Sequence, residues 1–485
     1  MPVGNGLGRL AGRGDMLGPR MGTGHLTRNA PERLPALRAS RMAWLGILVT
    51  GSLLVAACGA AEDRSEDPAE TPATIAEPAV VEDSSTAPAS TQPATTTGAV
   101  TAPSSTTTPA PEQEETERAE TEPEAEPDPK QGLDPVVAYA TEPWPTDWAS
   151  RSIDLSELLL GIGTIDPRDA IPPIDDPIFE SVGEATEWLD SRAPGMLVSI
   201  GGESRFYALS ILHRHEIVND RIGDIPVAVT YCPLCNTALA FDRRVGGEVL
   251  RFGVSGLLRN SDLVMWDDGT VSLWQQVTGE AIVGTAAGTF LTHIPSAIVS
   301  FGEFAAAYPD GQSLSQDTGF GIPYGFNPYE GYSSRSAPYP FFSGEVDPRY
   351  GALERVVGVT IGGAATAYPF PLLTEAGTVN DSVGGIPITV FWGGDTADAL
   401  DSRVVRDGRA IGTGIAYLRQ VDGRPLTFVK EGEVFRDQET SSTWTLLGEA
   451  INGPLAGTRL EIAVHRNEFW FAWGAFFPDG DVYEG

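Results

Sequence analysis

The sequence predicts a mainly β (α+β) protein, in which two tandem copies of a β-rich repeat with short helices follow a disordered tether. Three observations lead to this prediction. Short runs of β-branched and aromatic residues alternate with Gly-rich turns from about residue 196 onward. Two parts of this region share sequence matches at a nearly constant spacing. The segment from residue 58 to 135 contains almost no large apolar residues.

Residues 1–57 have the pattern of an export signal. An apolar run over residues 43–57 follows several arginines and is shorter than the roughly 20 residues of a membrane-spanning helix. The run ends Val55-Ala56-Ala57-Cys58-Gly59, which resembles a bacterial lipoprotein signal, in which the chain is cut before the cysteine and the thiol carries lipid. We therefore expect Cys58 to anchor the exported protein to the outer face of the cell membrane. The alternative is an ordinary signal peptide with a chance cysteine.

The tether and the extension after it differ in composition. Residues 58–135 consist mainly of Ala, Thr, Pro, Ser and Glu, which bury too little apolar surface to offset the entropy of ordering the chain. Their Glu-rich part, residues 112–128, repels itself and extends the chain. Residues 136–195 are expected to form helices and loops, with helix signals over residues 181–191.

The first repeat is expected over residues 196–318. Residues 225–231 form an apolar, β-branched run that predicts a strand. Gly246-Gly247 and Asp267-Asp268-Gly269 are typical of hairpin turns. Aromatic residues at helical spacing over residues 301–308 predict a short helix that closes the repeat.

A Gly-, Pro- and Tyr-rich linking loop over residues 319–356 and a second, degenerate repeat over residues 357–485 complete the prediction. Matches at an offset of 161 residues pair Tyr207 with Tyr368, Asn219 with Asn380, and Pro226 with Pro387. Matches further along, such as Gly279 with Gly448 and Phe304 with Trp473, keep an offset of 169 residues, so a short insertion separates the two groups.

Comparison of the two copies indicates which Cys and His residues the fold itself does not require. At the first offset, Cys232 corresponds to Gly393, Cys235 to Thr396 and His215 to Ala376. Residues that shape the backbone persist in both copies, whereas these soft and basic side chains occur in the first copy alone. A fold that the second copy attains without them does not require them, which favours a site in the first repeat.

The motif Cys232-Pro233-Leu234-Cys235 is the main candidate for chemistry. Two thiols at this spacing can share a metal ion, and His215 is the candidate third ligand. Thiolate and imidazole ligands suit copper or zinc. Either His213 or His293 is a candidate for a fourth ligand. Tyr231 and Asn236 are expected to orient the ligands through hydrogen bonds.

Two other functions remain open for the same motif. An exported protein can use a C-x-x-C pair as a thiol–disulfide couple, but such a pair normally begins a helix, and Asn236-Thr237 does not indicate one. The third possibility is a non-enzymatic surface module, for binding or for structure, with a local disulfide. Whether the protein is an enzyme is left open, because the sequence contains no clear Ser-His-Asp order, phosphate loop or paired-carboxylate motif.

Three sequence strings carry a family resemblance: His215-Glu216-Ile217-Val218-Asn219-Asp220, then Ile225-Pro226-Val227-Ala228-Val229-Thr230-Tyr231-Cys232-Pro233-Leu234-Cys235-Asn236-Thr237-Ala238, and Asn260-Ser261-Asp262-Leu263. The region from about residue 165 to 345 resembles domain-of-unknown-function family 3179 (DUF3179), and a degenerate copy follows. The resemblance implies no particular activity, because the family has none established. The chain departs from the family pattern at Arg214, where an aromatic residue is common.

The charge balance bears on possible partners. The chain carries 66 Asp and Glu against 32 Lys and Arg, a net charge of −34. Nucleic-acid binding depends on neutralising phosphates with basic side chains, so we expect no nucleic-acid partner. The expected partner is the membrane, through the lipid anchor, and the sequence names no protein or small-molecule partner.

Overall fold

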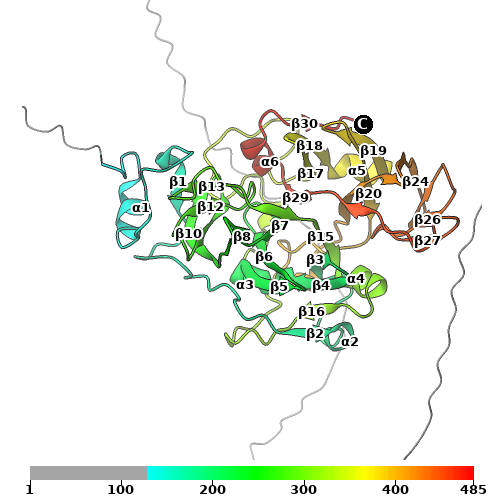
Figure 1. Cartoon of the computed structure of the whole chain (residues 1–485), viewed down its shortest axis with the longest axis horizontal. Coiled ribbons are helices and arrows are strands. Elements are labelled where there is room, and N and C mark those ends of the chain that lie inside the picture. The colour runs from blue at the N-terminus through cyan, green and yellow to red at the C-terminus, as the bar shows by residue number, and fades with distance from the viewer. Residues whose placement is uncertain (1–127) are drawn as a thin grey trace, which may run out of the picture. The chain divides into compact units, whose positions relative to one another are not determined.

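A computed structural model describes residues 128–485 of the chain (Figure 1). The predicted signal peptide, the lipidation site Cys58 and nearly all of the predicted tether lie outside the described residues. The described part is mainly β, as predicted, with short helices between its strands. None of its helices combines the length and the apolar character needed to cross a membrane.

The extension before the first repeat is mostly loop. It contains α1 (Pro135–Ala140), the 3-10 turn η1 (Leu155–Glu157), β1 (Leu158–Leu160), β2 (Phe179–Ser181) and α2 (Val182–Ala185). Helix α2 is much shorter than the predicted helix over residues 181–191. It begins with a capping box, in which the side chains of Ser181 and Glu184 satisfy each other's backbone N–H groups.

The first half of the fold, residues 194–314, opens with a sheet in the order β15-β3-β4-β16-β2. Its further strands are β3 (Pro194–Ile200), β4 (Glu203–Ala208), β15 (Ser296–Ser300) and β16 (Gln312–Leu314). The second half, residues 355–482, has a sheet in the order β29-β17-β18-β30, formed by β17 (Arg355–Ile361), β18 (Ala364–Pro369), β29 (His465–Phe469) and β30 (Asp481–Val482). The last strand of each half pairs in parallel with its neighbour: β16 with β4 in the first half, and β30 with β18 in the second.

A second sheet of the first half carries the cysteine motif. Its order is β14-β7-β6-β5, with β5 (Ile217–Ile222), β6 (Ile225–Cys232), β7 (Thr237–Asp242) and β14 (Thr292–Ile294). The second half repeats this order as β28-β21-β20-β19, with β19 (Thr378–Val383), β20 (Ile386–Gly393), β21 (Thr413–Leu418) and β28 (Glu461–Ile462). The central strand β6 is almost entirely buried, as its apolar and β-branched sequence predicts.

The third sheet also has a counterpart. Its order is β1-β10-β11-β12-β13, with β10 (Phe252–Arg259), β11 (Asp262–Asp267), β12 (Leu273–Gln275) and β13 (Ala281–Val283). The second half has β24 (Phe428–Glu431), β25 (Val434–Asp437), β26 (Thr443–Trp444) and β27 (Ala450–Asn452) in the same succession. The two-stranded hairpins β8–β9 (Arg244–Val245, Glu248–Val249) and β22–β23 (Gln420–Val421, Arg424–Pro425) also occupy the same place in chain order.

Helices occur at matching points of the two halves. Helix α3 (Leu209–His215) and helix α5 (Phe370–Ala376) each connect the first sheet to the second, whereas α4 (Phe301–Ala307) and α6 (Trp470–Phe476) follow β15 and β29. Between the halves, residues 315–354 contain the 3-10 turn η2 (Tyr332–Ser334), and η3 (Val405–Asp407) lies in the second half.

Individual side chains repeat the same contacts in the two halves. The Tyr207 hydroxyl donates to Asp220 at 2.5 Å, and the Tyr368 hydroxyl donates to Asp381 at 2.9 Å. The indole N–H of Trp274 donates to Asp267 at 2.9 Å, and that of Trp444 donates to Asp437 at the same distance. Equivalent residues therefore have equivalent environments at these two places.

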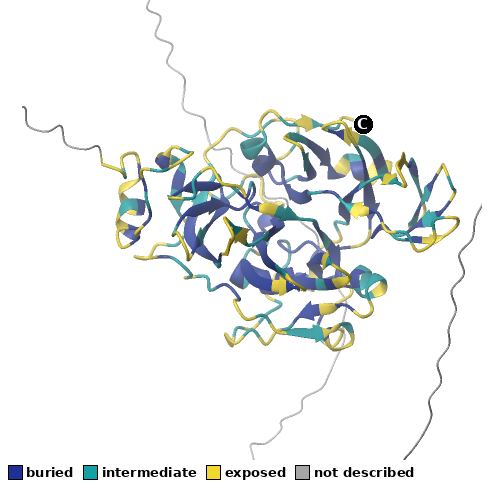
Figure 2. Cartoon of the chain, viewed as in Figure 1, coloured by how far each residue is buried: buried dark blue, intermediate teal, exposed yellow. Residues whose placement is uncertain are grey.

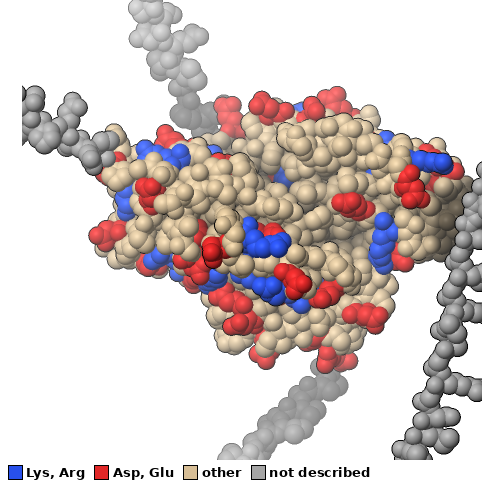
Figure 3. All heavy atoms as spheres, viewed as in Figure 1, with Lys and Arg blue, Asp and Glu red and all other residues tan. Residues whose placement is uncertain are grey.

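One large buried apolar cluster contains residues of both halves, among them Tyr231 and Phe252 of the first and Phe391, Tyr417 and Phe469 of the second. A separate cluster, which includes Tyr368 and Trp392, lies within the second half. Figure 2 shows buried segments in both halves. The surface is charged with both signs, and the face in Figure 3 shows acidic side chains interspersed with basic ones. The two halves are therefore not independent domains, because each covers apolar surface of the other.

We expect Asp437→Ala to lower the free energy of unfolding by about 3 kcal/mol. Asp437 is buried and accepts from four donors: the backbone N–H groups of Thr440 and Ser442, the Thr440 hydroxyl and the Trp444 indole. The change leaves the Thr440 N–H and the indole without an acceptor, whereas the Ser442 N–H keeps the Thr440 hydroxyl. Urea denaturation measures the change. The exposed Glu461→Ala is the control, expected to change stability by less than about 0.5 kcal/mol, and a similarly small effect of Asp437→Ala would contradict the prediction.

Candidate functional site

The cysteine motif forms the turn of the β6–β7 hairpin. Cys232 ends β6 and pairs with Thr237 at the start of β7, so residues 233–236 make the loop. Asn236 adopts a left-handed conformation, with φ of 55°, and its backbone N–H donates to Pro233 O at 3.3 Å. Both cysteines are free and buried. The pair thus lies on a strand-to-strand turn and not at the start of a helix.

Asp262 joins the two cysteines. One ligand atom each from Cys232, Cys235 and Asp262 lie within 4.8 Å of one another. Asp262 begins β11 directly after Asn260 and Ser261, whose positive φ angles of 52° and 62° make a tight hairpin turn. The Cys232 thiol donates to Ser261 O at 3.5 Å, which brings this turn against the cysteine loop.

The hydrogen bonds of Asp262 leave one of its oxygens free. Asp262 Oδ2 accepts from Gln275 Nε2 at 2.5 Å and from the backbone N–H of Val277 at 3.0 Å, whereas Oδ1 has no hydrogen-bond partner in residues 128–485. The residue is completely buried, and this burial raises the pKa of its carboxyl to about 7. A carboxylate fixed through one oxygen, with the other unpaired, is arranged as a metal ligand is.

The thiols are held in their neutral form. Burial raises the pKa of Cys232 and raises that of Cys235 well above its ordinary value, and the nearby Asp262 carboxyl acts in the same direction. A redox-active cysteine needs the opposite, a lowered pKa that supplies thiolate at neutral pH. A bound cation would supply the missing positive charge.

The structure does not bring His215 into this group. Its Nδ1 lies 2.7 Å from Pro172 O, so this nitrogen carries the proton and donates. Its Nε2 lies 2.6 Å from the Tyr324 hydroxyl, which therefore donates to the ring. Both ring nitrogens are engaged, and burial lowers the pKa of His215, in agreement with a neutral ring.

The two alternative histidines also lie elsewhere. The buried His213 packs between Tyr231 and Tyr329, with ring centroids 5.6 and 5.8 Å away, and burial lowers its pKa to about 3. His293 packs against Phe241 at 4.8 Å. Within the described chain, neither belongs to the group of Cys232, Cys235 and Asp262.

Tyr231 and Asn236 form hydrogen bonds that position the cysteine loop. The Tyr231 hydroxyl donates to Asn236 Oδ1 at 3.4 Å, and Asn236 Nδ2 donates to Asn467 O at 3.1 Å. The loop is also held from outside, because the backbone N–H of Phe469 donates to Cys235 O at 3.0 Å. Strand β29 of the second half thus fixes the loop of the first.

Glu216 was not singled out from the sequence. It is 8 % exposed, its φ is 58°, and it ends helix α3 in a left-handed conformation. Its counterpart at the end of α5 is Gly377, with φ of 70°, the residue type that this conformation favours. Burial raises the pKa of the Glu216 carboxyl to about 8, and Asp262 is the next largest cause.

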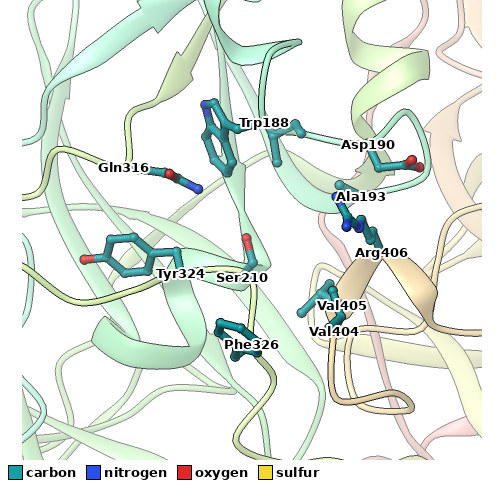
Figure 4. Close-up of a pocket in the computed structure, with 12 residues that line it drawn as sticks. Trp188, Asp190, Ala193, Ser210, Gln316, Tyr324, Phe326, Val404, Val405 and Arg406 are labelled. Carbon is teal, nitrogen blue, oxygen red and sulfur yellow. The ribbon is translucent and has the colours of Figure 1, made fainter. Parts of the chain in front are cut away.

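Glu216 lines a cavity of about 270 Å³ beside the cysteine loop. Leu234, which stands between the two cysteines, is another wall. A second cavity, of about 260 Å³, is lined by residues of both halves and of the segment between them, among them Ser210, Tyr324 and Arg406 (Figure 4). Figure 4 shows Tyr324 on one side of it and Arg406 on the other, and none of the clustered ligands lines it.

The second half lacks every member of the group. Gly393 and Thr396 stand at the cysteine positions, and Gly377 stands for Glu216. At the spacing that pairs Asp267 with Asp437 and Trp274 with Trp444, Asp262 corresponds to Gly432, in the turn before β25. Two signals could have identified the residues that were missed: Asp262 and Glu216 both lie within the family strings, and the repeat places Gly377 opposite Glu216.

We expect Glu216→Gly to unfold with a free energy about 1 kcal/mol greater than that of Glu216→Ala, because only glycine is unstrained at this φ. Both variants remove the buried carboxyl, so their difference isolates the backbone conformation. Urea denaturation of the two variants measures it. An alanine variant as stable as the glycine variant would contradict the account of strain at this residue.

Comparison with known proteins finds one family. The model of DUF3179, a protein family of unknown function, matches residues 168–480, which include both halves of the fold. No curated protein matches the chain. No solved structure matches it either. The chain belongs to the DUF3179 family, as its sequence strings predict.

Proposed function

We propose that the first half holds a metal ion, zinc or copper, on Cys232, Cys235 and Asp262. The observation that carries the proposal is the convergence of three buried ligand atoms within 4.8 Å, one of them a carboxylate oxygen without a partner among the described residues. Sulfur ligands of a tetrahedral zinc ion lie about 2.3 Å from the metal and hence about 3.8 Å apart, which is compatible with this spacing. His215 is not part of the proposed ligand set.

Electrostatics supports a cation at this point. Two thiols and Asp262 are buried together, and the buried Glu216 and Glu468 carboxyls add to the acidic surroundings. Each of these groups makes ionisation of its neighbours harder. A metal ion reverses this effect, because it binds the deprotonated thiols and carboxylate, and its binding releases their protons.

Three protein ligands leave a fourth position open. Structural zinc sites are normally closed by four protein ligands, whereas an open position binds water or another small molecule. The cavity lined by Glu216 and Leu234 lies beside the cysteine loop, although none of the three proposed ligands lines it. The arrangement supports a site that binds or transforms a ligand more than a purely structural one.

A thiol–disulfide couple is the second candidate. The proximity of the two cysteines and the export signal favour it, because exported proteins form disulfides readily. The raised pKa values of both thiols and the turn position of the motif weigh against it. A permanent local disulfide without redox function is the third candidate.

We expect the Cys58→Ser chain to purify with about one zinc or copper ion per molecule and two protected thiols. The changes Cys232→Ser, Cys235→Ser and Asp262→Asn should each lower metal affinity at least about tenfold, because each removes a ligand. His215→Gln is the matched control and should keep the metal. Elemental analysis and thiol titration provide the measurements.

The other candidates give different results in the same experiment. A metal-free protein with a disulfide that mild reductants open supports the redox couple. A metal-free protein whose disulfide resists them supports the structural bridge. Equal metal loss in His215→Gln and Asp262→Asn would contradict the proposed ligand set.

We further propose that the protein is a lipoprotein held at the outer face of the cell membrane through Cys58. The support is the sequence Val55-Ala56-Ala57-Cys58 after an apolar run and arginines. A spacer of low apolar content over residues 58–135 would place the folded region at a distance from the membrane. This arrangement would present the metal site to the extracellular medium.

Cys58→Ser is expected to move the protein from the membrane fraction to the soluble fraction, because the serine hydroxyl does not accept the lipid. Cell fractionation followed by immunoblotting measures this. Cys232→Ser is the control, which removes a thiol without touching the anchor and should leave the protein in the membrane. A Cys58→Ser protein that stays membrane-bound would place the anchor elsewhere.

A further inference from the structure

We propose that the cavity beside the cysteine loop binds a small organic ammonium ion, with its charge on the Glu216 carboxylate and its apolar body against the cavity walls. The cavity measures about 270 Å³, just below the range of about 300–1,000 Å³ for pockets of drug-sized ligands, which suits a small ligand. None of the proposed metal ligands lines this cavity. The cavity does adjoin the cysteine loop, because Leu234, which lies between the two cysteines, is one of its walls.

Glu216 supplies a carboxyl group without a partner, and a cation bound beside it favours the ionised form. It is 8 % exposed, and its carboxylate forms no hydrogen bond or ion pair with any residue of the described chain. No Lys, Arg or His lines the cavity. Arg335 stands 4.9 Å from the ring centroid of Tyr339, another lining residue, but it does not pair with Glu216. A buried carboxylate is stabilised by a cation that arrives with a ligand.

The walls of the cavity suit an apolar body. Most of them are aliphatic, and aromatic rings complete them; examples are Ile171, Leu257, Leu263, Tyr329 and Phe341. Aromatic faces attract ammonium ions through their electron-rich π systems. One carboxylate with aromatic and aliphatic walls therefore selects an amine over an anion or a sugar.

The backbone at Glu216 supports a role in binding. A non-glycine residue in the left-handed conformation is strained, and such strain is concentrated at functional sites. At the equivalent position after helix α5, the second half has Gly377, which adopts this conformation without strain. The backbone is anchored on both sides, since Glu216 N–H donates to Leu212 O and Glu216 O accepts from Tyr231 N–H, each at 2.8 Å. The side chain is thus held at the cavity by a fixed backbone.

The test uses the Cys58→Ser chain and two probes of equal size, benzylamine and benzyl alcohol. We expect benzylamine to bind at least tenfold more tightly than benzyl alcohol at neutral pH in isothermal titration calorimetry. Glu216→Gln, which keeps the shape of the side chain, should abolish this preference while metal content and melting temperature stay unchanged. Phenylacetate should bind no more tightly than benzyl alcohol, because its negative charge opposes ionisation of Glu216 and meets no basic side chain in the cavity.

Glu330→Gln is the matched control. Glu330 is exposed and adjacent to the cavity residue Tyr329, so this change removes the same charge without entering the cavity. It should leave the preference for benzylamine intact. Three results would overturn the proposal: equal binding of the two probes to the unmodified cavity, unchanged benzylamine binding in Glu216→Gln, or loss of metal from Glu216→Gln, which would make Glu216 a metal ligand instead.

Discussion

The cysteine loop depends on hydrogen bonds from a strand that belongs to the other half of the fold. The backbone of β29 donates to Cys235 O through Phe469 and accepts from Asn236 through Asn467. These bonds hold the turn of the β6–β7 hairpin, which carries both cysteines, against β29. The second half thus has a clear physical role although it lacks all the ligand residues: it closes the core and holds the loop in place.

The interior around this loop is acidic, which is unusual for a shared core. Asp262, Glu216 and Glu468 are all buried, and Arg466, which bonds Glu468 at 2.8 Å, is the basic side chain paired within this group. Burial of unpaired acids is unfavourable unless they are protonated or neutralised. The raised pKa values at Asp262 and Glu216 reflect this cost, and both proposals assign a positive ion to the groups that bear it.

The sequence was sufficient for the mainly β fold and for the cysteine motif, because strand periodicity and C-x-x-C spacing are local properties. It was insufficient for the third member of the group. Asp262 reaches the cysteines because two hairpins of different sheets pack against each other, which a single sequence does not reveal. His215 was favoured by its basic side chain, yet Pro172 and Tyr324 occupy its two nitrogens. The predicted helix over residues 181–191 failed after one turn, where the chain enters the turns before β3.

The left-handed corner after helix α3 has a consequence for comparing proteins of this family. Glycine adopts this left-handed conformation with the least strain, and Gly377 occupies the equivalent position. We therefore expect glycine at this position in sequences that no other constraint acts on. Glutamate at this corner, together with both cysteines, would then mark a half that keeps the proposed site. Glycine at the corner and the loss of the cysteines would mark a half that lacks it. The three alignment columns of Glu216, Cys232 and Cys235 thereby sort members of the family by the proposed site before any of them is purified.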